Sequence, residues 1–116
     1  MRLLIMGPPG VGKGTQAKIL NENLGIAHIS TGELLRTEID NDTKIGKIAK
    51  RYINQGNLVS DNLILEIVKD RLSMNDCKSG YILDGFPITL NQAIGLEVIM
   101  KDINQNLDIA ISLSAN

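Results

Sequence analysis

Tryptophan is absent from this chain of 116 residues, and cysteine and histidine each occur only once. The single cysteine, Cys77, cannot form an intramolecular disulfide, which predicts a reducing, cytoplasmic environment. One histidine and one cysteine are too few for a zinc site built from the usual His and Cys ligands, so we expect none.

A strong excess of charge is lacking as well. Twelve Lys and Arg residues stand against 13 Asp and Glu residues, which leaves a formal net charge of −1. Nucleic acids and anionic membranes attract basic surfaces, so we expect neither as a partner. No apolar run is long enough to cross a bilayer, and Met1 leads directly into a predicted strand, so we expect no signal peptide. The balance of 43% hydrophobic and 22% charged residues is typical of one globular domain.

A glycine-rich segment follows the first apolar run of the chain. The run Leu3-Leu4-Ile5-Met6 predicts a strand, and Gly7, Gly10 and Gly12 then precede Lys13, where a helix is expected to begin. Such a loop turns its backbone N–H groups inward beside the positive end of the helix, which is an arrangement suited to phosphate. A lysine that reaches the outer phosphates and a threonine hydroxyl near magnesium complete the pattern of a nucleoside triphosphate site. A plain strand-to-helix turn would account for the glycines but not for Lys13 and Thr15.

The rest of the chain alternates between strand and helix patterns. Strands are expected at 3–6, 26–29, 80–84 and 107–113, and helices at 13–23, from 30 onward, around 45–53, at 60–72 and at 90–104. Ser30 with Glu33 has the spacing of a capping box, and Ser60 is expected to cap the helix that follows it. This alternation predicts an α/β fold with three layers, built on an open parallel sheet of about four strands.

Three segments that carry candidate functional residues are expected to meet at one edge of that sheet. Gly7, Ser30 and Asp84 each lie at or just after the end of a predicted strand. In open parallel sheets, ligands bind beyond the carboxyl ends of the strands. The sequence therefore predicts a ligand site at this edge.

Several of these residues have simpler interpretations. Asp84 is followed by glycine and could form an ordinary turn, although beside a phosphate loop a role near magnesium is favoured. Arg36 could clamp a phosphate or pair with Asp40 one turn further on, and spacing slightly favours the pair. His28 is expected to be a packed strand residue rather than a catalytic base.

Two further groups also have plain alternatives. Gln92 stands at capping-box spacing from Thr89, so a purely structural role explains it as well as a binding role does. The basic residues of the helix expected near residue 48 are predicted to form its solvated side; they are Lys44, Lys47, Lys50 and Arg51.

Together these segments resemble the adenylate kinase family. The matching motifs are the loop 7–17, including the glycine between Lys13 and Thr15, the segment 28–36, the segment 56–61, and Asp84-Gly85-Phe86-Pro87 with Thr89 and Gln92. They occur in the family's order and cover nearly all of this chain, but only the first part of the family's usual length. The resemblance implies a P-loop NTPase-like core at 1–29 and 60–116, with a small helical AMP-binding insertion at 30–59.

The resemblance also implies roles for individual residues. ATP would be held by the loop residues Gly10, Val11, Gly12, Lys13, Gly14 and Thr15, and Thr15 and Asp84 would serve Mg²⁺ through water. AMP would be held by Thr31, Arg36, Leu58, Val59, Gly85 and Gln92. Lys13, Arg36 and Asp84 would be the catalytic residues. Thr31 favours AMP, because relatives acting on UMP or CMP tend to carry alanine there.

Two departures from the family pattern bear on activity. The family has an arginine directly after the proline of the third motif, where this chain has Ile88. The chain also stops at Asn116, before the family's lid over ATP and the arginines that this lid carries. Phosphoryl transfer depends on alignment and positive charge, so we expect severely weakened activity from this chain.

By this resemblance we expect an adenylate kinase activity, the reversible transfer of the terminal phosphate of Mg·ATP to AMP, which yields two ADP. One alternative is a nucleotide-binding fragment without catalysis, and another is a kinase of the UMP or CMP type. The family suggests a monomer, while the last strand, 107–113, would be an exposed sheet edge through which copies of the chain could self-associate.

Overall fold

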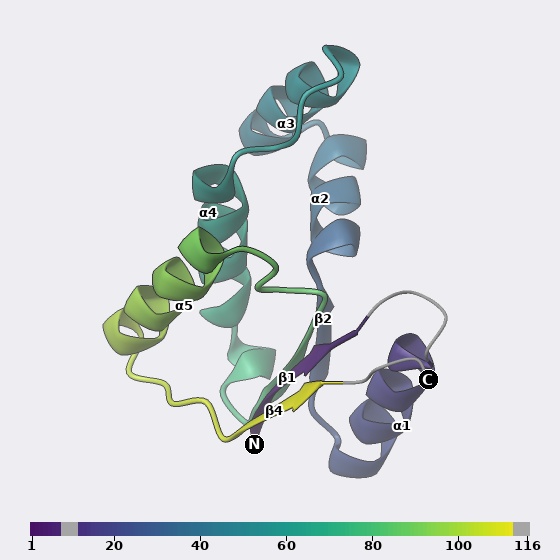
Figure 1. Ribbon diagram of the computed structural model, residues 1–116, viewed down its shortest axis with the longest axis vertical. Coiled ribbons are helices and arrows are strands. Elements are labelled where there is room, and N and C mark those ends of the chain that lie inside the picture. Colours follow the sequence, from purple (N-terminus) through teal and green to yellow (C-terminus); the bar gives the residue numbers. More distant parts are fainter. Residues whose placement is uncertain (8–11, 113–116) are drawn as a thin grey trace.

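A parallel sheet of four strands forms the centre of the computed structural model, which describes residues 1–7 and 12–112 (Figure 1). The spatial order is β2-β3-β1-β4, and every neighbouring pair is parallel. In chain order the elements are β1 (Arg2–Met6), α1 (Lys13–Leu24), β2 (Ala27–Ser30), α2 (Thr31–Asp40), α3 (Lys44–Asn54), α4 (Asp61–Leu72), a 3₁₀ turn (Asn75–Cys77), β3 (Tyr81–Asp84), α5 (Leu90–Asp102) and β4 (Ile109–Ser112). This confirms the predicted α/β class.

Alternating residues of β1 face two different helix layers. Leu3 and Ile5 pack with Ala17 of α1 on one face of the sheet. On the other face, Leu4 belongs to a larger buried cluster with α4 and α5, whose members also include Val68, Leu72, Leu96 and Met100. The strand is therefore apolar on both faces, as a parallel sheet covered on both sides requires. The result is the predicted three-layer arrangement.

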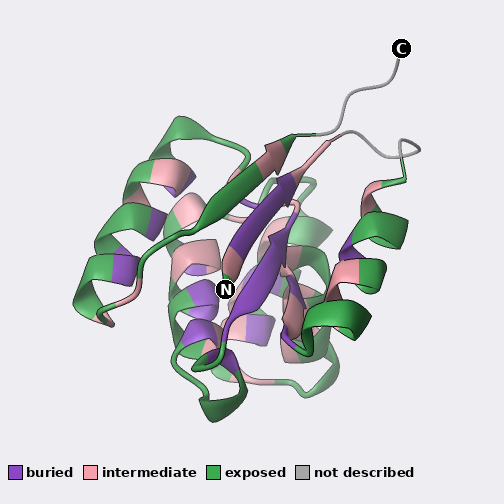
Figure 2. Cartoon of the chain, turned by 90° about the horizontal axis from the view of Figure 1, so that it is seen from below, coloured by how far each residue is buried: buried purple, intermediate pink, exposed green. Residues whose placement is uncertain are grey.

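The sheet edges differ in exposure. β1 and β3 lie in the middle and are largely buried, whereas β4 is mostly exposed along one edge (Figure 2). Ile109 keeps 46% of its surface exposed. The strand begins at Ile109, two residues later than predicted, and Leu113 lies outside the described residues.

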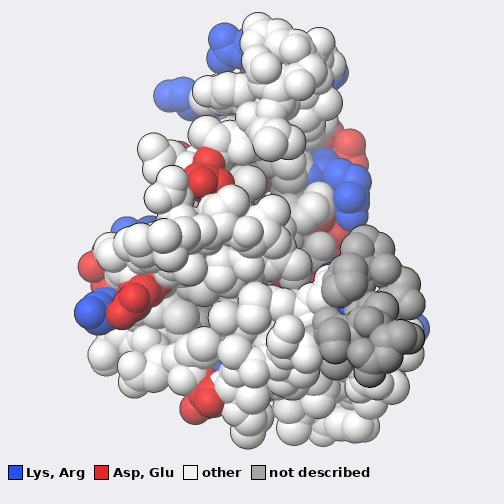
Figure 3. All heavy atoms as spheres, viewed as in Figure 1, with Lys and Arg blue, Asp and Glu red and all other residues white. Residues whose placement is uncertain are grey.

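Helices α2 and α3 stand beyond the carboxyl edge of the sheet (Figure 1). They pack tightly at Gly46, where a Cβ atom would overlap the backbone of Glu38. Thr43, a cap that the sequence analysis did not identify, accepts a 3.0 Å hydrogen bond from the N–H of Gly46 and begins α3. The basic side of α3 is exposed as expected, and Figure 3 shows basic atoms at this end of the molecule.

The predicted caps had mixed outcomes. Ser60 and Thr89 do cap α4 and α5, because each hydroxyl accepts a hydrogen bond from the N–H three residues later, at 3.3 and 3.1 Å. The capping box at Ser30 was wrong: Ser30 is the N-cap residue of α2, but its side chain accepts no capping hydrogen bond. Ser30 is also the last residue of β2, so its backbone is already fixed by the pairing with Asp84.

Candidate functional site

The ends of three strands bring the first group of candidate residues together. Ile5 of β1 and Ser30 of β2 are both in register with Asp84, the last residue of β3. Lys13, the first residue of α1, donates a hydrogen bond from Nζ to a carboxylate oxygen of Asp84. Gly85 follows directly, and a Cβ at that position would lie 3.8 Å from the same Nζ. Lys13, Asp84 and Gly85 thus form one cluster at the predicted edge.

Helix α1 begins next to this cluster with a glycine. Gly12 is the N-cap residue of α1 and has φ 85°, a left-handed conformation that side chains make costly. Gly14 and Thr15 lie exposed in the first turn of the helix. Gly10 and Val11, also expected to hold ATP, lie outside the described residues. The N-terminal end of α1, with the N–H groups of its first turn, therefore lies at the same edge as Lys13.

Asp84 has a second partner, which the sequence analysis missed. The Nε2 of His28 on β2 lies 2.9 Å from an Oδ atom of Asp84 and donates to it. His28 is therefore not simply a packed strand residue, and its side chain is 28% exposed. The signal was present in the alternation of β2, because His28 and Ser30 lie on the same face, and Ser30 is the residue paired with Asp84.

The electrostatics of Asp84 result from two opposing effects. Burial by itself raises the pKa of this carboxyl group, but the hydrogen bonds from Lys13 and His28 outweigh it, so that the pKa lies below its usual value. An ionised carboxylate at the carboxyl end of a strand suits a hydrated divalent cation. Within the described ranges, no group of three or more His, Cys, Asp or Glu residues gathers to hold a metal ion. Any Mg²⁺ here would rely on one carboxylate, water and phosphate oxygens, which is how Mg²⁺ is commonly held.

A hollow of about 310 Å³ contains the second group of candidate residues. Leu58, Val59 and Gln92, all expected on the AMP side, line it together. So do residues that the sequence analysis did not assign to it, namely Leu35, Ile53, Asn57, Asp61, Ile64, Ile88 and Thr89. Its volume falls within the range of small-molecule sites. The walls are mostly apolar, with polar side chains at Asn57, Asp61, Thr89 and Gln92.

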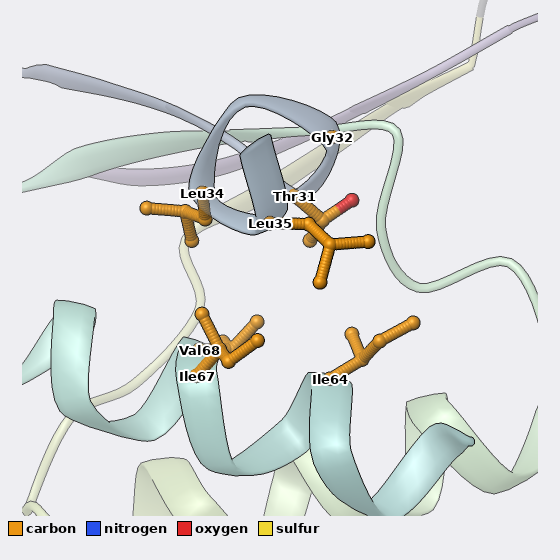
Figure 4. Close-up of a pocket in the computed structure, with 7 residues that line it drawn as sticks. All are labelled: Thr31, Gly32, Leu34, Leu35, Ile64, Ile67 and Val68. Atoms are coloured by element: carbon orange, nitrogen blue, oxygen red, sulfur yellow. The ribbon is translucent and has the colours of Figure 1, made fainter. Parts of the chain in front are cut away.

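Thr31 lines a smaller, adjacent cavity of about 100 Å³ between α2 and α4. In Figure 4, Leu34 and Leu35 of α2 point toward α4, whose Ile64 and Val68 form the opposite wall. Leu35 and Ile64 belong to both cavities, so Thr31 is next to the larger hollow rather than part of it.

Arg36 lines neither of these two cavities. In the part of the chain that the structure describes, no ion pair joins it to Asp40, which was the simpler interpretation. Its Nη1 instead lies back along α2, where a Cβ at Gly32 would be 3.5 Å away. The guanidinium group is thus directed toward the N-terminal end of α2 and the carboxyl edge of the sheet.

Comparison with known proteins places the chain among nucleotide kinases. A family model described as adenylate kinase matches residues 5–116. A protein named adenylate kinase from Caldicellulosiruptor saccharolyticus is 50% identical over 113 residues, which is 97% of this chain and 53% of the relative. A protein named adenylate kinase from Methanocella arvoryzae is 50% identical over 97% of this chain and 52% of its own length. Another of that name, from Clostridium botulinum, is 51% identical over 96% of this chain and 51% of its own length. The chain therefore spans about half the length of the curated relatives it matches.

Proposed function

Since the chain belongs to the adenylate kinase family, we propose that it contributes to reversible transfer of the terminal phosphate of Mg·ATP to AMP, giving two ADP. The observation that carries this proposal is the pairing of two unlike sites at one edge of the sheet. The ion pair of Lys13 with Asp84 lies beside Gly85, and a hollow of about 310 Å³ is lined by Ile88 and Gln92, a few residues further along the chain.

The first site is assigned to ATP. Its outer phosphates would be held by Lys13 and by the backbone N–H groups of the loop, whose other proposed residues are Gly10, Val11, Gly12, Gly14 and Thr15. The left-handed backbone at Gly12 and the ion pair of Lys13 with Asp84 support this assignment. When a triphosphate binds, the ammonium group of Lys13 would pair with its phosphate oxygens instead of with Asp84.

When bound, Mg²⁺ would neutralise negative charge on the phosphate oxygens during phosphoryl transfer. Its proposed holders in this chain are the carboxylate of Asp84 and the hydroxyl of Thr15, both acting through water. The low pKa of Asp84 supports this, because a carboxylate must be ionised to orient cation-bound water.

The second site is assigned to AMP. Leu58, Val59 and Gln92, which line the hollow, would enclose the base, with Thr31 of the adjacent cavity at its margin. Gly85 remains a proposed contact of AMP, although it lines neither cavity and lies beside Nζ of Lys13. Arg36 would bind the AMP phosphate, and its direction toward the edge of the sheet supports this. Lys13, Arg36 and Asp84 would then flank the migrating phosphoryl group and supply the positioning and the charge that this reaction needs.

The chain's organisation follows from these assignments. We propose that residues 30–59, which include α2 and α3, are an AMP-binding insertion, and that 1–29 and 60–116 form the core. The tight packing of Gly46 against Glu38 supports treating the two helices as one unit. None of the helices in the described part of the chain combines the length and apolar character needed to span a membrane. A cytoplasmic location and a monomeric state, with self-association through β4 as the alternative, complete the proposal.

Ile88 supports a second candidate, a nucleotide-binding unit with little catalysis. The side chain stands in the hollow where the family has an arginine, and 76% of its surface is exposed. A missing cation at that point weakens both AMP phosphate binding and phosphoryl transfer.

A coupled assay of ADP formation from ATP, AMP and Mg²⁺ tests the proposal. We expect a low rate that depends on AMP and is abolished in Lys13→Met, whose residual rate measures any contribution from a contaminating kinase. Binding of an ATP analogue and AMP without turnover would favour the non-catalytic candidate. Faster turnover with CMP or UMP would overturn the assignment of AMP.

A further inference from the structure

Gln92 lies at the centre of a hydrogen-bond network that joins α4 to α5. Its side chain is buried, with 2% of the residue exposed. Its Oε1 accepts a 2.8 Å hydrogen bond from the backbone N–H of Ile88, and its Nε2 donates at 2.9 Å to Oδ1 of Asp61. The other oxygen of Asp61 accepts from the hydroxyl of Thr89 at 3.2 Å. Both ends of the Gln92 amide are thus engaged by groups from elsewhere in the fold.

These partners leave the amide only one orientation. A backbone N–H can only donate, so the atom facing Ile88 must be the oxygen of Gln92. A carboxylate can only accept, so the atom facing Asp61 must be the nitrogen. A flipped amide would set donor against donor at Ile88 and acceptor against acceptor at Asp61. Because the site is buried, each such mismatch would leave polar groups without partners.

The free positions of the amide matter because Gln92 lines the hollow of about 310 Å³. One N–H of Nε2 and one lone pair of Oε1 remain for a ligand. A 6-aminopurine offers an acceptor at N1 beside a donor at its amino group, whereas a 6-oxopurine offers a donor at N1 beside an acceptor at O6. An amide with a fixed order of donor and acceptor pairs with only one of these two edges in a given pose.

We propose that Asp61 is a positioning residue that locks the Gln92 amide and thereby makes the hollow select a 6-aminopurine over a 6-oxopurine nucleotide. This inference rests on the proposed function, since it assumes that the hollow receives the base of AMP. In this proposal Asp61 acts by holding Gln92, although it also lines the hollow itself. Its own position is rigid, because it begins α4, whose Leu63 and Ile67 are buried in the fold.

A merely structural role for Asp61 predicts a different outcome. Asp61 links the starts of α4 and α5 through Thr89 and places a negative charge at a helix N-terminus, and both features stabilise the fold. If that were its only role, its removal would lower the free energy of unfolding without changing which purine binds. The two roles are therefore separated by the ratio of two affinities measured on the same protein.

The experiment compares Asp61→Ala with Asp61→Asn by calorimetric titration with AMP and with inosine monophosphate. Asparagine removes the charge but can still offer its oxygen to Nε2 of Gln92, whereas alanine leaves the N–H of Ile88 as the remaining hold on the amide. We expect Asp61→Ala to reduce the preference for AMP over inosine monophosphate about tenfold, as expected when a group in a buried hydrogen-bonding site is freed. Asp61→Asn should keep the ratio within about threefold of that of the original chain.

A second measurement tests, without any ligand, whether the Gln92 amide is held in one orientation. The side-chain NH₂ resonances of Gln92 should be distinct and protected from exchange in the original chain and in Asp61→Asn, but should sharpen and exchange faster in Asp61→Ala. If Asp61→Ala keeps both its Gln92 resonances and its purine preference, the positioning role is overturned while the proposed function stands. If the original chain binds neither nucleotide in the hollow, the proposed function and this inference both fail.

Discussion

His28 and Asp84 lie on neighbouring strands, with the Nε2 of the histidine 2.9 Å from a carboxylate oxygen of the aspartate. Lys13 donates to the other oxygen, so a single carboxylate joins β2, β3 and the start of α1. This junction stands at the edge where the nucleotide phosphates are proposed to bind. It is therefore important both to the stability of the sheet and to its proposed chemistry.

Asp84→Asn should destabilise the fold in a way that depends on pH. The pKa of Asp84 is lower in the folded chain than in the unfolded chain. Its ionised form therefore stabilises the fold above about pH 4, the ordinary pKa of a free carboxyl group. This stabilisation is lost as the pH falls through the pKa of the folded state. We expect a loss of about 2 kcal/mol at pH 7 and a clearly smaller loss near pH 3, measured by urea unfolding.

Asp102→Asn is the control for this prediction. Asp102 pairs with Lys69 at 3.8 Å with both side chains about half exposed, so its replacement should cost less than about 0.5 kcal/mol at either pH. A loss for Asp84→Asn that is equal at pH 7 and pH 3 would contradict the assigned role of its charge.

Lys13→Met should weaken the binding of a non-hydrolysable ATP analogue by about 30-fold, because a charge-assisted contact to phosphate is removed. Lys18→Met is the matched control: it lies on the same helix, is exposed, and should change the affinity less than twofold. Fluorescence or calorimetric titration measures both. If both substitutions weaken binding equally, Lys13 contributes only a positive charge on α1 and makes no direct contact with a phosphate.

Ile88→Arg should raise the affinity for AMP about tenfold and increase ADP formation, because it supplies a cation beside the hollow. The exposed position of Ile88 leaves room for the longer side chain, so no cost in stability is expected. Ile88→Gln, which is polar but uncharged, should give no comparable gain. If the arginine variant matches the glutamine variant in the coupled assay, the missing charge at this position is not what limits the reaction.

Gly46→Ala should destabilise the chain by about 2 kcal/mol, because the new Cβ would overlap the backbone of Glu38 and force α2 and α3 apart. Gly95→Ala is the paired control, since the new atom there meets only the mobile end of Leu65 while alanine favours the helix. Its stability should remain within about 1 kcal/mol of that of the original chain. Thermal unfolding followed by circular dichroism tests the pair, and similar losses for both would argue against the proposed close packing at Gly46.

Much of the architecture could be predicted because it depends on neighbouring residues. The apolar run before Gly7 specifies a strand, and Gly25 ends α1 with φ 63° while its N–H binds the carbonyl of Asn21. The cap at Ser60 also forms as predicted. The break between α2 and α3 was less visible, since Thr43 was not identified as a cap. The capping box at Ser30 failed because sheet pairing, rather than the side chain, sets the backbone there.

The sequence by itself therefore determined the order of strands and helices and the glycine-lysine segment at their first junction, because these features are written in short-range patterns of polarity and backbone preference. Only the tertiary structure decided which distant groups become partners. Lys13 meets Asp84 across 71 positions of the chain, and Asp61 meets Gln92 across 31. Such pairs depend on how the layers pack and on which strands come into register. A carboxylate that looks like part of a turn, or a glutamine that looks like a cap, acquires its role only when packing brings donors and acceptors together.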